Sequence, residues 1–162
     1  MAKKKQTVTN AMRMLDKAHI AYEAVEYDAG DEVGENFGER IAELTGIPAE
    51  KSFKTLVLRG KNGIYVCCIP VACELDLKKL AEISGEKKVE MIHVRELLGL
   101  TGYIRGGVSP IGMKKKYRTF IHKSALSYDK VAVSGGMCGI TLLMKPQDLL
   151  GACDAEAKDI VK

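Results

Sequence analysis

The pattern of apolar and polar residues changes its period twice within the first fifty positions. Apolar residues at helical spacing predict a helix from about Thr9 to Ala18, with Thr7 or Thr9 available to cap its start. Residues 22–27, YEAVEY, alternate apolar and polar, which is typical of a half-buried strand. An acidic, glycine-containing loop follows at 28–36, and then a short helix from Phe37 to Leu44 that Gly46 closes.

The clearest local signal is the segment FKTLVLRGKNGIYVCCIP, residues 53–70. Two runs that favour strands flank Lys61-Asn62-Gly63, and this arrangement predicts a β-hairpin. We expect Asn62 and Gly63 to supply the positive φ angles of its turn.

The second half of the chain continues with short elements of both kinds. It predicts a helix, a strand, a helix, three strands and a last helical turn, at residues 75–85, 87–92, 93–100, 117–123, 129–135, 139–145 and 146–152. Tight turns join several strands, so the expected fold class is α+β with a largely antiparallel or mixed sheet. A regular βαβα alternation is missing, which disfavours a Rossmann-type fold. The length of 162 residues fits one domain over residues 1–162.

Composition favours a soluble protein of the cytoplasm. The start, MAKKKQTVTNAMRML, lacks the apolar segment of a secretory signal, and no run approaches the roughly 20 apolar residues of a membrane helix. The five cysteines form no CxxC pair and the three histidines no HxH or HxxxH, so we expect no metal, no cofactor and no disulfide framework. The adjacent Cys67 and Cys68 are interpreted as small core residues of a strand. A catalytic thiol is the alternative, and no neighbouring motif supports it.

The net charge of +4 is distributed unevenly. Residues 28–50 contain seven acids and one base, whereas residues 97–128 contain six bases and no acid. This asymmetry predicts one positive face suited to an anionic partner such as phosphate or RNA. A solvated basic surface without a ligand is the alternative.

The basic segment contains a glycine-rich stretch, TGYIRGGVSPIGMKKK, at residues 101–116. Gly107 and Gly112 have the spacing of a Walker A loop, but Met113 follows them and the lysines come too late; a GxGxxG fingerprint is also missing. Adjacent glycines leave amide N–H groups open to an oxyanion or a carboxyl oxygen. Because VSGGMCG at 133–139 repeats the theme, we expect the two loops to form a pocket, although glycines of ordinary strand turns explain each loop alone.

No standard hydrolase machinery accompanies these loops. The chain has no GxSxG elbow, and no grouping of Cys, His and acid stands out. Lys54 opens the apolar strand FKTLVL, where a charge needs either a partner, a ligand or a route to solvent along the strand end. The residues alone leave these alternatives open.

Five segments together carry a family resemblance: FKTLV, LDLKKLA, KKVEM, TGYIRGGVSPIGMKK and VSGGMCGITLLMKPQDL occur in this order. They resemble the YbaK-type aminoacyl-tRNA deacylases, relatives of the editing domain inserted in bacterial prolyl-tRNA synthetase, from the first helix to about Leu150. The most similar subgroup is the free-standing enzymes that clear Cys-tRNA(Pro). The resemblance implies a compact α+β domain with a mixed, barrel-like sheet flanked by helices. It also implies hydrolysis of the ester that joins a misplaced amino acid to the 3′ end of tRNA.

The resemblance assigns a site residue by residue. The key lysine of the family falls on Lys54, for which we expect an electrostatic or orienting catalytic role. The substrate-binding positions fall on Tyr27, Phe37, Thr55, Gly106, Gly107 and Ser134. The amides of Gly106 and Gly107 are expected to hold the aminoacyl group or its oxyanion. Some family members carry Asp where this chain has Thr141, so Thr141 receives no role.

The resemblance also implies a mechanism and partners. The cysteine thiolate of the substrate attacks its own ester carbonyl, so positioning matters more than a protein nucleophile. The partners are aminoacyl-tRNA(Pro) and, in a ternary complex, prolyl-tRNA synthetase. Two alternatives remain at this point: a deacylase for Ala-tRNA(Pro) or another aminoacyl-tRNA, and a non-catalytic module that binds tRNA or a synthetase.

Overall fold

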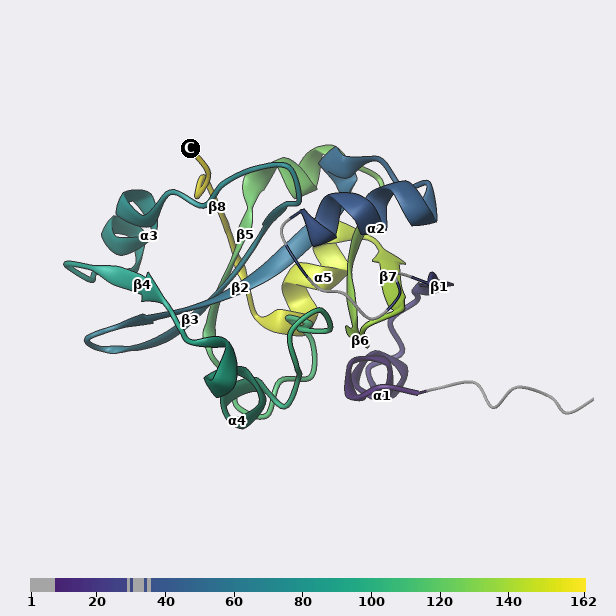
Figure 1. Ribbon diagram of the computed structural model, residues 1–162, viewed down its shortest axis with the longest axis horizontal. Coiled ribbons are helices and arrows are strands. Elements are labelled where there is room, and N and C mark those ends of the chain that lie inside the picture. Colours follow the sequence, from purple (N-terminus) through teal and green to yellow (C-terminus); the bar gives the residue numbers. More distant parts are fainter. Residues whose placement is uncertain (1–7, 29, 31–33, 35) are drawn as a thin grey trace, which may run out of the picture.

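The computed structural model describes residues 8–28, 30, 34 and 36–162 of the chain. The helices among them are α1 (Asn10–Lys17), α2 (Phe37–Thr45), α3 (Leu77–Ser84), α4 (Leu97–Thr101) and α5 (Pro146–Cys153), with short 3-10 turns η1 (Ala49–Lys51), η2 (Val94–Glu96) and η3 (Lys123–Ser127). The strands are β1 (Glu23–Glu26), β2 (Phe53–Gly60), β3 (Gly63–Pro70), β4 (Val89–Met91), β5 (Arg118–His122), β6 (Val131–Met137), β7 (Ile140–Met144) and β8 (Glu156–Lys158). Figure 1 shows their arrangement, and the α+β class is confirmed.

Local chemistry explains where the helices begin and end. The Thr9 hydroxyl accepts the Met12 N–H at 3.2 Å and so caps α1, as its position predicted. Asp76 caps α3 by accepting two backbone N–H groups of the first turn. Gly46 and Gly85 end α2 and α3 in the left-handed conformation that glycine adopts without strain.

The β2–β3 hairpin forms as predicted, but its turn differs in detail. Gly60 pairs with Gly63, so the turn consists of Lys61 and Asn62. The expectation of a positive φ at Asn62 was wrong, and Gly63 has a φ of 159°, close to extended backbone. The turn makes a contact that is distant in sequence: the carboxylate of Glu86 accepts the Asn62 N–H at 2.9 Å.

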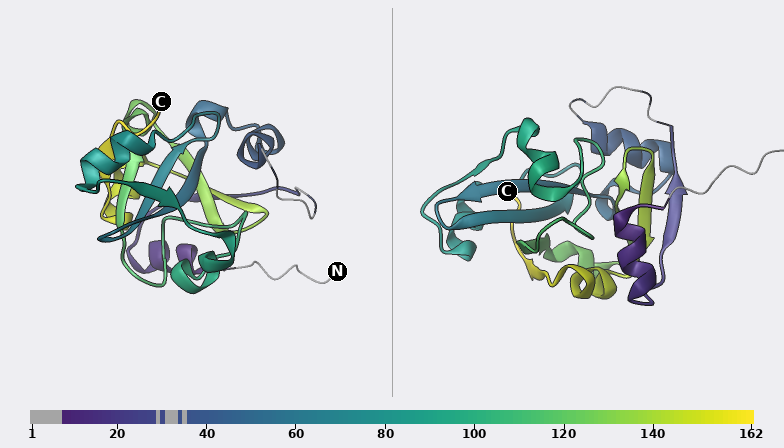
Figure 2. Two further views of the ribbon diagram at one scale, coloured as in Figure 1. Left: turned by 60° about the vertical axis from the view of Figure 1, so that its left-hand side comes forward. Right: turned by 90° about the horizontal axis from the view of Figure 1, so that it is seen from below.

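The strands form two sheets where the sequence predicted one. The larger sheet has the order β4-β2-β3-β5-β8, antiparallel from β4 to β3 and parallel from β3 to β8, and the smaller has the order β1-β7-β6. The parallel bridge Ser52–Ala132 joins the two sheets. Figure 2 shows the β2–β3 hairpin projecting away from the smaller sheet. The cavity described below lies between the two sheets.

Both faces of β3 are buried. Side chains alternate across a strand, so Cys67 packs with Leu80 of α3 and Phe120 of β5 in one cluster, whereas Cys68 packs with Leu142 of β7 in another. The interpretation of the two cysteines as core residues is thus confirmed.

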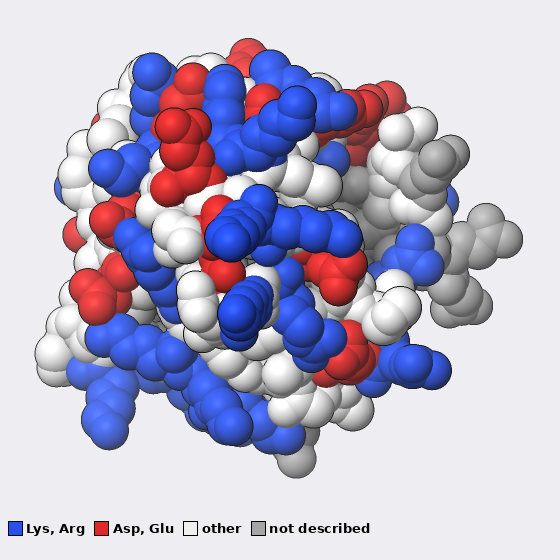
Figure 3. Space-filling model, turned by 90° about the vertical axis from the view of Figure 1, so that its left-hand side faces the viewer, with Lys and Arg blue, Asp and Glu red and all other residues white. Residues whose placement is uncertain are grey.

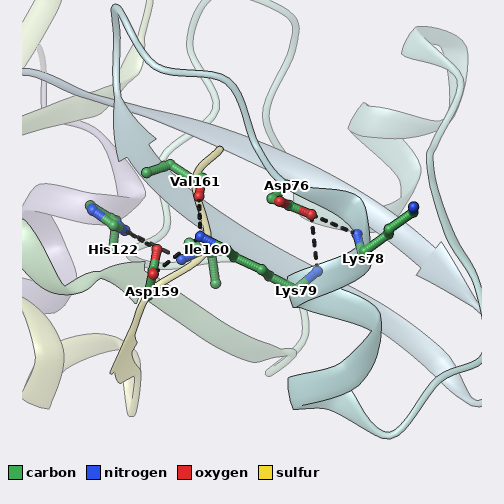
Figure 4. Close-up of polar contacts among 7 residues, drawn as sticks. All are labelled: Asp76, Lys78, Lys79, His122, Asp159, Ile160 and Val161. Atoms are coloured by element: carbon green, nitrogen blue, oxygen red, sulfur yellow. Dashed lines mark hydrogen bonds and ion pairs between the residues drawn. The ribbon is translucent and has the colours of Figure 1, made fainter.

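A C-terminal strand that the sequence did not predict, β8, completes the larger sheet. The segment after β8 is fastened from both sides: Lys79 Nζ donates to the Val161 carbonyl at 2.7 Å and pairs with Asp159 at 3.1 Å (Figure 4). Nδ1 of the buried His122 accepts the Ile160 N–H at 3.3 Å. Together with the parallel pairing of β8 with β5, these contacts on the residues that follow explain why the short polar segment EAK forms a strand.

Candidate active site

A cavity of about 480 Å³ lies in the gap between the two sheets. Its lining comes from α2, β2, the region of β4, the glycine-rich loop, β6 and β7. The sheets meet at the Ser52–Ala132 bridge, and both of these residues line the cavity. Of the seven residues assigned from the sequence, six line this cavity: Tyr27, Phe37, Lys54, Thr55, Gly106 and Ser134.

Lys54 lies near the start of β2, opposite Ile69 of β3, and is half-buried. Within the described part of the chain, no carboxylate pairs with its ammonium and no side chain hydrogen bonds to it. A half-buried cation beside an apolar wall is costly without a counter-charge, so this position favours an anionic ligand.

The first half of β2 has an open edge. β3 covers one edge of β2 over its whole length, but β4 covers the other edge only over Leu58–Gly60. The carbonyl of Val57 accepts the Ile92 N–H at 3.2 Å, so the odd-numbered residues of β2 direct their backbone groups toward this second edge. The N–H and C=O of Thr55 therefore point away from β3, and Thr55 lines the cavity.

Tyr103 holds both glycine-rich loops together, a role that the sequence reasoning missed. Its hydroxyl donates to the buried Ile111 carbonyl at 2.6 Å. A Cβ on Gly136, whose φ is 94°, would lie 2.8 Å from the Tyr103 ring, and one on Gly112 would lie 3.0 Å from its hydroxyl. The two loops need glycine because they close around this ring.

The two adjacent glycines differ in what they offer a ligand. Gly106, with a φ of 89°, lines the cavity. Gly107 is buried behind it, where a Cβ would lie 2.9 Å from the Cys138 nitrogen, and its N–H donates to the Ile104 carbonyl at 2.9 Å. A turn hydrogen bond thus already engages the Gly107 amide, so the role expected for Gly107 stays a prediction and Gly106 is the more accessible of the two glycines.

Two hydroxyls from neighbouring strands form part of the cavity wall. Ser134 of β6 lies opposite Thr141 of β7, and both line the cavity. The Thr141 hydroxyl donates to the Val133 carbonyl at 2.9 Å, which leaves its oxygen as an acceptor. Ser134 accepts the Gly136 N–H at 3.3 Å, which leaves its own proton available to donate. The pairing of Ser134 with Thr141 depends on the β6–β7 register, which shifts between Ser134 and Met137, so strand periodicity alone did not reveal it.

Tyr27 follows β1 and reaches the cavity from the side of the small sheet. Burial raises the pKa of Tyr27 above its ordinary value, and the neighbouring Cys138 thiol acts in the same direction. The phenol is therefore neutral at physiological pH and can donate a hydrogen bond.

The thiols behind the cavity are unsuited to nucleophilic catalysis. Cys68 lies 3.6 Å from the Thr55 hydroxyl, and burial raises the pKa of its thiol to about 12. Burial also raises the pKa of Cys67 and of Cys153. Because only the thiolate attacks carbonyls efficiently, these groups fit the core.

Two of the six basic residues in the stretch 97–128 are paired with acids. Lys116 pairs with Asp154 at 2.9 Å, and Arg118 pairs with Glu156 at 3.2 Å. Arg105 instead lines the cavity. Acids of the C-terminal segment, distant in sequence, thus balance part of the basic stretch.

Comparison with known sequences defines the class of protein. Residues 36–152 match the model of the aminoacyl-tRNA editing domain family, and the chain belongs to that family. The chain is 44% identical over 162 residues to EbsC of Enterococcus faecalis, a protein assigned as a Cys-tRNA(Pro)/Cys-tRNA(Cys) deacylase, and the match covers 99% of this chain and 98% of EbsC. The resemblance to this family is thereby confirmed.

Other relatives place the same module inside larger enzymes. A proline–tRNA ligase of Thermosipho africanus is 30% identical over 99 residues, which cover 61% of this chain and 17% of that ligase. A crystal structure described as a trans-editing enzyme for prolyl-tRNA synthetase superposes with a TM-score of 0.82 at 24% identity, over 94% of this chain and 95% of that one. The latter shows the shared fold.

The described residues also limit other kinds of site. None of their helices is long and apolar enough to cross a membrane. No three His, Cys, Asp or Glu side chains within the described ranges are grouped to hold a metal ion.

Proposed function

We propose that this protein is a trans-editing hydrolase that deacylates mischarged Cys-tRNA(Pro). The observation that carries the proposal is the cavity itself, where Lys54, without a described acidic partner, lies beside the open strand edge at Thr55. The near full-length similarity to EbsC supports the same substrate class. A cavity of about 480 Å³ suits an aminoacyl group with its terminal ribose.

The chemistry needs no protein nucleophile. The substrate thiolate attacks its own ester carbonyl and forms a carbon–sulfur bond; the carbon–oxygen bond to the tRNA 3′ end then breaks, and the departing oxygen takes up a proton. Water opens the resulting thiolactone to free cysteine. The protein lowers the barrier by holding the thiol against the carbonyl and by stabilising the negative charge that develops on oxygen.

Three groups of the cavity suit this task. Lys54 supplies a positive charge near the ester and the terminal nucleotide. The N–H groups of Thr55 and Gly106 are the candidate donors to the oxyanion, since that of Gly107 is already used. Ser134 and Tyr27 can donate hydrogen bonds at the other wall.

The test is a deacylation time course on Cys-tRNA(Pro), Ala-tRNA(Pro) and Pro-tRNA(Pro) with the wild type and Lys54→Ala. We expect rapid loss of cysteine alone, and a loss of at least about 100-fold in kcat/KM for the variant, as for removal of one transition-state contact. Lys51→Ala is the matched control, because Lys51 lies three residues earlier with its ammonium 5.7 Å from the centre of the Tyr128 ring. Full activity of Lys54→Ala would refute the assignment.

The same assay separates the remaining functions. Faster loss of alanine would make the protein an Ala-tRNA(Pro) deacylase. No hydrolysis of any substrate by a folded protein that binds tRNA would identify a binding module.

The cavity reads only the aminoacyl end, so selection of tRNA(Pro) needs another reader. We propose a ternary complex with prolyl-tRNA synthetase in the cytoplasm, where the five free cysteines would stay reduced. Addition of the synthetase should then raise kcat/KM on Cys-tRNA(Pro) above that on other cysteinyl-tRNAs.

A further inference from the structure

A basic groove lies at the end of the molecule away from the small sheet. It has a volume of about 550 Å³ and is lined by Arg59, Gly60, Lys61, Asn62, Gly85, Glu86, Lys87, Lys88 and Glu90. Figure 3 faces this end, where α3, β4 and the hairpin tip gather, and Lys and Arg cover more of the surface than Asp and Glu. The groove is separate from the cavity that holds Lys54.

The groove is rigidly built. The Glu86 carboxylate turns inward, where it accepts the Tyr65 hydroxyl at 2.6 Å and the Asn62 N–H at 2.9 Å. Gly60 packs so closely against it that a Cβ at this position would overlap the carboxyl group of Glu86. The hairpin turn and the α3–β4 connection are thereby fastened together, with the acid beneath the surface.

The lysines of the groove are free to bind an anion. Lys61, Lys87 and Lys88 are exposed, and none forms an ion pair with any residue that the structure describes. Arg59 differs, because it pairs with Glu96 at 2.8 Å. Three unpaired ammonium groups on a fixed frame suit a chain of phosphates better than a compact ligand.

The groove and the cavity share two strands. Met91 of β4 lines the cavity and the preceding Glu90 lines the groove. Lys61 directly follows β2 and lies seven positions after Lys54, which corresponds to roughly 23 Å at about 3.3 Å per residue. A nucleic acid whose 3′ end lies at Lys54 can therefore reach the groove within several nucleotides.

We propose that this groove binds the phosphate backbone of the tRNA acceptor stem while the aminoacyl end occupies the cavity. The inference rests on the proposed function. Lysines at phosphates position the substrate and carry no sequence information, so the groove contributes affinity and leaves selection of tRNA(Pro) to a partner.

The experiment compares two triple variants and two substrates. Lys61→Ala/Lys87→Ala/Lys88→Ala removes the groove charges. The control, Lys17→Ala/Lys130→Ala/Lys145→Ala, removes the same charge from exposed lysines on α1 and beside the small sheet. Each protein is assayed on Cys-tRNA(Pro) and on 2′(3′)-O-cysteinyl-adenosine over a range of salt, and its affinity for uncharged tRNA is measured.

The groove variant should lose about tenfold or more in kcat/KM on Cys-tRNA(Pro) at 0.1 M salt. The slope of log kcat/KM against log salt concentration should also be smaller in magnitude by about 2–3 than in the wild type. Its activity on cysteinyl-adenosine and the behaviour of the control variant should stay unchanged. Equal losses on both substrates, or tRNA affinity equal to that of the control, would overturn the inference. So would intact tRNA binding combined with weaker association with prolyl-tRNA synthetase, which would assign the groove to a protein partner. If the wild type shows no deacylase activity but binds tRNA more tightly than the groove variant does, the result would support the groove and refute the proposed function.

Discussion

Removal of one hydroxyl, in Tyr103→Phe, tests how the glycine-rich loops are held. Tyr103 is 5% exposed, and its hydroxyl donates at 2.6 Å to the buried carbonyl of Ile111. The substitution keeps the ring against which Gly112 and Gly136 pack, so the expected loss comes from the hydrogen bond alone. An unmade hydrogen bond to a buried acceptor costs about 1–3 kcal/mol, and we expect a loss of about 1–2 kcal/mol. For a chain of this length the melting temperature should fall by about 2–8 °C.

Alkaline pH provides an independent arm of the same test. Burial raises the pKa of Tyr103 to about 12, whereas the unfolded phenol titrates near about 10. The stability that Tyr103 contributes is therefore fully present below pH 10 and is lost as the pH rises toward 12. The variant lacks this titration, so the gap between wild type and variant should narrow across that window.

The measurement is urea unfolding of both proteins at pH 7, 10 and 11.5. Tyr117→Phe is the matched control, because its hydroxyl donates to the Leu100 carbonyl at the same 2.6 Å from a less buried position, and the cost there should be smaller. A gap between wild type and Tyr103→Phe that is absent at pH 7, or constant across the pH range, would refute the reasoning.

Three further predictions concern other parts of the molecule. Gly136→Ala should lower the free energy of unfolding in urea by about 1–3 kcal/mol and reduce deacylation, because Gly136 has a positive φ and contacts the Tyr103 ring. Gly99→Ala is the control and should be neutral or slightly stabilising, since the space around Gly99 is open. Equal effects of the two substitutions would contradict the role of the loop. Burial lowers the pKa of His122, so its contribution to stability is fully present above about pH 6.5 and is lost as the pH falls below that value. In His122→Asn the free energy of unfolding should therefore depend less on pH between pH 8 and 5. A dependence equal to that of the wild type would exclude His122 as the cause. Cys68→Ser should retain deacylation within about threefold, since burial raises the pKa of that thiol to about 12, and a folded but inactive variant would revive the thiol mechanism.

Most elements could be predicted because their signals are local. Thr9 caps α1, Gly46 and Gly85 end their helices, and alternating residues in the hairpin mark two strands that pair with each other. The strand β8 was not predicted because contacts with residues distant in sequence stabilise it. The division into two sheets was not predicted for the same kind of reason. Periodicity specifies which face of a strand a residue lies on, but it does not specify which strand lies beside it.

The site was predictable to the extent that a motif fixes a backbone position. Lys54, Thr55 and Gly106 line one cavity because β2 and the glycine-rich loop border the same gap. The engagement of the Gly107 amide depends on the turn formed with Ile104, which no pairwise spacing reveals. The role of Tyr103 depends on two loops closing around one ring, and adjacent glycines in both loops were the available sign of that close approach.

The bridge at Ser52 and Ala132 is the vertex of the angle between the two walls of the cavity. Thr55 lies three residues along β2 from this vertex, or roughly 10 Å. A rotation of one sheet by about 6° around the bridge therefore moves Thr55 by about 1 Å, comparable to the difference in size between small side chains. The width of the cavity therefore depends on the angle between the two sheets as a whole. Ser52 and Ala132 themselves line the cavity, so substitutions at the vertex can change which small residues fit both directly and through the angle between the sheets.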